Sequence, residues 1–73
     1  MKSELVYVVK REEFNGKVCD IFYLNDAMNK ALDINHPTYK DNLIKAYEDI
    51  LFYTQITGVR FIDRRREYEE NAR

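Results

Sequence analysis

Cys19 and His36 could supply a cysteine nucleophile and a histidine base, and the chain holds one residue of each type. Asp20 or Asp33 would then orient the imidazole ring. Such a mechanism needs the thiol within hydrogen-bond reach of the ring and an oxyanion hole close to both. The sequence does not bring these groups together, and a cysteine in an apolar strand is usually a small hydrophobic residue. We therefore expect no catalytic residue.

Metal and cofactor chemistry also lacks a pattern in this sequence. One histidine and one cysteine, without a repeated Asp-x-Asp spacing, do not make up a ligand set. Gly16 and Gly58 are isolated, and a turn and a helix end explain them, so we expect no phosphate-binding loop. No pair of carboxylates stands alone in apolar sequence, where the pKa of one would rise. We expect no metal, no cofactor and no enzymatic activity.

An arginine cluster lies near the C-terminus, in the segment "RFIDRRREYEENAR". Arg60, Arg64, Arg65 and Arg66 could bind phosphates, and Tyr68 could stack on a base. The same segment also carries four carboxylates, at Asp63, Glu67, Glu69 and Glu70. A charge-balanced, solvated tail is therefore the simpler interpretation. Binding to nucleic acid through these five residues is our alternative hypothesis.

Length and composition indicate one small folded domain. The 73 residues are 45% hydrophobic and carry a net charge of −1, which provides no overall field to attract nucleic acid or an anionic membrane. An apolar segment long enough to span a bilayer is missing from the sequence. We expect a domain over residues 1–62 and a charged tail over residues 63–73 that is helical or frayed. The expected localisation is cytoplasmic, without membrane association.

A β-hairpin is the clearest local element. Asn15-Gly16 is typical of a two-residue type I′ turn, which requires positive φ at both positions. Such a turn sets the register of the flanking strands. The predicted pairs are Phe14 with Lys17, Arg11 with Asp20, Val9 with Phe22, and Tyr7 with Leu24.

Two helices and a third strand are predicted after the hairpin. Asn25 or Asp26 can cap a short helix over residues 26–33. A break at residues 35–37 leads into a long helix that ends before Gly58. Residues 59–62 are apolar and suggest a strand added to the hairpin. The predicted fold is α+β in the order ββααβ, with a small antiparallel sheet packed on the long helix. The core-facing arc of that helix is predicted to contain Tyr39, Leu43, Ile44, Ala46, Tyr47, Ile50, Leu51 and Tyr53.

Apolar surface is the feature that points to a function. Both faces of the hairpin are apolar, and one long helix can cover only one of them. The candidate interface residues are Val6, Val8, Ile21 and Tyr23 on the second sheet face, with Phe52 and Ile56 on the polar side of the helix. Packing of the last two under the tail or against Met28 is an equal alternative. We predict a protein-interaction module, either a regulator or inhibitor that docks on a larger protein or a homodimer, of the kind that bacteria and phages encode.

Overall fold

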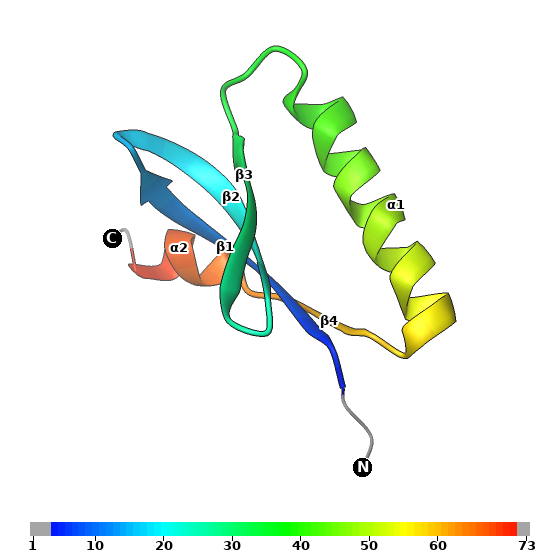
Figure 1. The fold of residues 1–73 in the computed structure, drawn as a ribbon. Coiled ribbons are helices and arrows are strands. Elements are labelled where there is room, and N and C mark those ends of the chain that lie inside the picture. Colours follow the sequence, from blue (N-terminus) through cyan, green and yellow to red (C-terminus); the bar gives the residue numbers. More distant parts are fainter. Residues whose placement is uncertain (1–3, 72–73) are drawn as a thin grey trace.

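A four-stranded mixed sheet with one long and one short helix makes up the protein, as a computed structural model shows (Figure 1). The structure describes residues 4–71, without the side chains of residues 55–57. The elements are β1 (Val6–Phe14), β2 (Lys17–Leu24), β3 (Ala27–Asp33), α1 (Tyr39–Thr57), β4 (Arg60–Asp63) and α2 (Arg66–Asn71). The strand order is β3-β2-β1-β4, with β4 parallel to β1 and the other pairs antiparallel. Within residues 4–71, no helix is both long and apolar enough to cross a membrane.

The β1–β2 hairpin has the predicted turn and the predicted register. Asn15 and Gly16 have φ values of 53° and 77°, as a type I′ turn requires. The pairs run from Phe14 with Lys17 to Tyr7 with Leu24. One hairpin face therefore points towards α1, and the other points away from it.

The predicted short helix over residues 26–33 is wrong, because these residues form strand β3. Asn25 and Asp26 have φ values of 50° and 68°, so they make a second tight turn instead of a helix cap. Asn25 exchanges hydrogen bonds with the backbone of Val6, at 2.9 and 3.1 Å, which holds this turn against β1. Alanine and methionine favour helices, but pairing with the free edge of β2 outweighs that preference. The order is βββαβα, and the long helix and final strand are close to their predicted positions in the sequence. The predicted antiparallel sheet is wrong for the final strand, because β4 returns after α1 and pairs parallel to β1.

Helix α1 covers one face of the sheet and ends at Gly58 as predicted, with a left-handed C-cap at φ 74°. Only part of the predicted core-facing arc is buried, because a helix lying on a sheet contacts it along a narrow strip. Ala46 and Ile50 are buried, whereas Ile44, Leu51 and Tyr53 are exposed, contrary to the prediction. The buried core consists of Tyr7, Val9, Phe22, Leu32, Ala46, Ile50 and Val59.

The C-terminal segment continues along β1 after α1. Arg60 donates its backbone N–H to Leu5 and Arg64 donates its own to Val9, both at 2.8 Å, so the parallel pairing extends to the end of β4. Helix α2 begins at Arg66, so residues 66–71 of the predicted tail are helical, whereas Asp63 belongs to β4. Arg65 binds Asp63, and Glu69 of α2 lies 3.9 Å from Arg11.

Replacing Gly16 with valine should destabilise the protein by roughly 1–3 kcal/mol, because a β-branched residue is strained at positive φ. Gly16→Asn is the matched control, since asparagine tolerates the left-handed region and should cost much less. Urea unfolding of the three proteins measures both effects. Equal stability of the valine variant and the parent would contradict the turn assignment.

Candidate functional site

A buried carboxylate is the most unusual group in the structure. Asp20 lies on the α1 side of β2 and has an exposed fraction of 0%. Arg11, its partner across the hairpin, donates two hydrogen bonds to it, from Nε at 2.8 Å and from Nη2 at 3.2 Å. The hydroxyl of Tyr39, the first residue of α1, donates a short third bond to Oδ2. Strands β1 and β2 and helix α1 therefore meet at this carboxylate.

Arg65 joins the same network from the segment before α2. Its Nη1 lies 3.5 Å from Oδ2 of Asp20, and its Nε and Nη2 bind the carboxylate of Asp63 at 3.1 and 2.9 Å. The guanidinium also stacks over the ring of Tyr47, 5.6 Å from the ring centroid. Arg65 thus links the C-terminal segment to both the sheet and α1, and its role in the structure is to hold these parts together.

The network keeps Asp20 ionised. Burial by itself raises the pKa of the Asp20 carboxyl, but hydrogen bonds from Arg11 and Tyr39, with the charges of Arg11 and Arg65, hold that pKa below its ordinary value. Burial and the bond to Asp20 raise the pKa of Tyr39, so its hydroxyl stays protonated and can donate. Both oxygens of the carboxylate accept hydrogen bonds from the chain, Oδ1 from Arg11 and Oδ2 from Arg11, Tyr39 and Arg65, which is the arrangement of a structural ion pair.

Cys19 and His36 do not meet in the described structure. Cys19 is buried on the sheet face away from α1, and burial raises the pKa of its thiol, which disfavours the reactive thiolate. His36 is exposed in the loop before α1, where its Nδ1 lies 3.1 Å from the backbone N–H of Thr38. Among the described residues, no group of three or more His, Cys, Asp or Glu side chains is placed to hold a metal ion.

The arginine cluster is largely compensated by carboxylates. Arg60 lies 3.2 Å from Glu4, and Arg64 lies 3.2 Å from Glu67. Arg65 is engaged by Asp63, as described above. Tyr68 is half-buried. Most of the positive charge proposed for phosphate binding is thus already paired.

A groove opens between the C-terminal half of α1 and the sheet, with a volume of about 520 Å³. Its walls contain apolar side chains from both sides and a single carboxylate. The lining residues are Leu5, Tyr7, Leu24, Asn29, Asp49, Phe52 and Tyr53. Phe52 is 62% exposed, and its ring packs edge-to-face against Tyr53 with centroids 6.4 Å apart. This groove is the candidate binding site.

A β-bulge places the side-chain amide of Asn29 in the groove. Phe22 pairs with Lys30 and Tyr23 pairs with Met28, so Asn29 is the extra residue between them. Its Nδ2 donates a hydrogen bond of 3.3 Å to the hydroxyl of Tyr7. Burial, with the nearby Tyr53 and Asp49, raises the pKa of Tyr7 and keeps its hydroxyl neutral. Lys30 and Asp49 both line a small adjoining cavity.

The predicted interface residues fall on opposite sides of the sheet. Phe52 lines the groove, whereas Val6, Val8, Ile21 and Tyr23 lie on the face away from α1. The side chain of Ile56 lies outside the described residues. Sequence reasoning missed the groove residues of the sheet and Asp49. Leu5 and Leu24 lie on the sheet face towards α1, but the sequence alone does not reveal that α1 leaves a groove beside them.

Comparison with known protein families, curated proteins and solved structures gives no match for this chain. Its function must therefore be inferred from the geometry of its own residues.

Replacing Asp20 with asparagine should lower the free energy of unfolding by roughly 2–4 kcal/mol, less than for a fully buried pair because Arg11 and Arg65 retain some contact with water. The amide would also direct N–H groups at arginine donors. Asp33→Asn is the matched control, since its salt-bridge partner Lys17 is 67% exposed and the pair should contribute under about 1 kcal/mol. Denaturant titration measures both, and similar losses would contradict the structural role of Asp20.

The stabilisation from Asp20 should disappear in acid. Its pKa is lower in the folded protein than the ordinary value of 3.8, so the unfolded chain binds the proton more readily. The contribution is fully present above the unfolded pKa and is lost as the pH falls through the folded pKa. The stability difference between the parent and Asp20→Asn should shrink over that range in unfolding experiments run at several pH values. A difference that is constant with pH would show that the carboxylate does not titrate as proposed.

Proposed function

We propose that this chain is a small non-enzymatic protein-interaction module, a regulator or inhibitor that docks on a larger protein through the groove between α1 and the sheet. The observation that carries the proposal is the groove itself, with the ring of Phe52 at its mouth. Exposed aromatic side chains beside an apolar cleft are typical of the central part of a protein interface.

The groove suits an anchor side chain that has an apolar body and a hydrogen-bond donor at its tip. Leu5, Leu24 and Phe52 supply the apolar contacts, and the carboxylate of Asp49 can accept the hydrogen bond. The groove lies between a helix and a sheet that are packed together. Binding of a partner should therefore cost little conformational entropy of this chain.

The non-enzymatic part of the proposal is supported by the surroundings of the reactive groups. Cys19 is buried, and the pKa of its thiol is raised. His36 accepts a hydrogen bond from the backbone N–H of Thr38 in its own loop. The guanidinium of Arg65 is paired with the carboxylates of Asp20 and Asp63. The groove itself contains a carboxylate, an amide and phenols, without a nucleophile activated by a neighbouring base.

Phe52→Glu should abolish partner binding, because it places a charge at the mouth of the apolar groove. Ile44→Glu is the matched control: Ile44 lies on the same helix and is 56% exposed, but it does not line the groove. Random displayed peptides would be selected on the immobilised parent, and the enriched peptides would be titrated against all three proteins. We expect binding to the parent and to Ile44→Glu, with at least a tenfold loss for Phe52→Glu.

Circular dichroism and unfolding curves would establish that both variants are folded. Peptides that bind Phe52→Glu as well as the parent would overturn the groove as the binding site. Failure to enrich any peptide that depends on Phe52 would do the same.

A further inference from the structure

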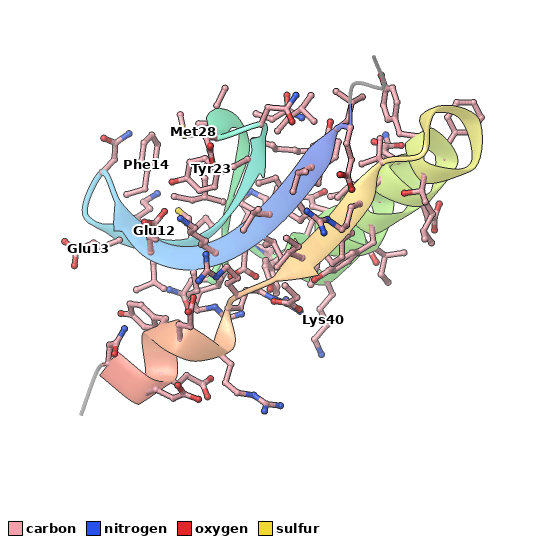
Figure 2. All side chains as sticks on the ribbon, turned by 90° about the horizontal axis from the view of Figure 1, so that it is seen from below. Glu12, Glu13, Phe14, Tyr23, Met28 and Lys40 are labelled. Atoms are coloured by element: carbon pink, nitrogen blue, oxygen red, sulfur yellow. The ribbon has the colours of Figure 1, made fainter. Side chains whose placement is uncertain are left out.

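The sheet face away from α1 is covered by neither helix of the described chain, and its apolar side chains range from buried, at Cys19 and Ile21, to 52% exposed, at Met28. Figure 2 shows Tyr23, Met28 and Phe14 on one side of the ribbon and Lys40 of α1 on the other. Arg65, just before α2, contacts Asp20, and Glu69 of α2 contacts Arg11, so both lie on the α1 side of the sheet. Strand register places the following apolar residues on the open face: Val6, Val8, Cys19, Ile21, Tyr23, Met28, Ala31 and Ile62.

Tyr23 covers the middle of this face. Its hydroxyl donates a 2.5 Å hydrogen bond to Glu12, which pairs with Cys19, so the ring extends along the strand past Ile21. The ammonium of Lys10 lies 5.3 Å from the centroid of the same ring. Ile21 is therefore only 2% exposed, and a contact would be made by Tyr23 and the residues around it, not by Ile21 itself. The bond to Glu12 and burial raise the pKa of Tyr23 to about 12, so the hydroxyl remains a donor at neutral pH.

The charges on this face balance one another. Lys17 lies 3.5 Å from Asp33 near the hairpin turn, and Arg60 lies 3.2 Å from Glu4 at the opposite end. Lys10 and Glu12 are joined through Tyr23, as described above. The face has no net charge: Lys10, Tyr23 and Glu12 form a cluster at its middle, and ion pairs lie towards its ends. A second copy would meet no electrostatic repulsion here, whereas a strongly charged partner would find no complementary field.

The size of the face suits a small dimer. With strands about 4.8 Å apart and about 3.3 Å per residue, a sheet of these dimensions has a footprint of roughly 450–500 Å². Two such faces bury on the order of 1,000 Å², which is near the lower limit of specific protein interfaces. Interfaces at this end of the size range are typical of weak, transient association.

We infer that a second copy of this chain covers the open sheet face, so that the two sheets pack face to face in a dimer. This inference is independent of the proposed groove, which lies on the other side of the sheet. Sedimentation equilibrium of the parent over a range of concentrations should show its mass rising from 8.8 kDa towards twice that value. A mass that stays at 8.8 kDa into the millimolar range would overturn the dimer.

Met28→Glu tests which surface forms the contact. Met28 is 52% exposed on the edge strand of the open face, so its replacement should leave the fold intact and weaken dimerisation at least tenfold. Leu51→Glu is the matched control, since Leu51 is 62% exposed on α1. Unaltered association of Met28→Glu, or loss of association in Leu51→Glu alone, would place the contact elsewhere and overturn the inference.

Charge reversal distinguishes a second copy from a different partner. Lys10→Glu gives the face a net charge of about −2 and Glu12→Lys gives it about +2, so each variant alone should repel itself at low ionic strength. An equimolar mixture should form a mixed dimer more strongly than either variant forms its own. A mixture that remains monomeric while the parent dimerises would contradict face-to-face packing of the two sheets.

Discussion

The buried carboxylate of Asp20 is the constraint on which the arrangement of this protein depends. An ionised group with no access to water is stable only if donors surround it. Here the donors come from β1, from the first residue of α1 and from the segment before α2, as Arg11, Tyr39 and Arg65. These three elements must therefore be in place together, and the removal of one donor leaves the others around a charge that is poorly compensated.

The position of the groove follows from the way α1 is held. Tyr39 fixes the N-terminal end of the helix to Asp20, and Ala46 and Ile50 bury its middle against the sheet. The C-terminal half then passes the ends of β1 and β2, where the side chains leave a groove. Because the groove lies between packed regular elements, its shape is set by the same contacts that stabilise the fold.

The two proposed surfaces lie on opposite sides of one sheet, so they can act at the same time. Sheet-to-sheet packing would leave both grooves facing outwards, one on each copy. A partner with two binding segments could then engage both grooves, and the second binding event would benefit from a high effective concentration. The weak association expected from a face of this size would make such binding sensitive to the concentration of the chain.

Local sequence determined the first hairpin and the end of the long helix. Asn15 and Gly16 specify a turn and thereby a register, and Gly58 provides the left-handed residue that ends α1. Only the tertiary structure decided that residues 27–33 form a strand, since that depends on the free edge of β2. It likewise decided that Asp20 is buried, because its donors include Arg65, which is 45 residues away. The groove was also decided only by the tertiary structure. It arises from contacts between residues distant in sequence, and such contacts do not follow from periodicity or turn chemistry.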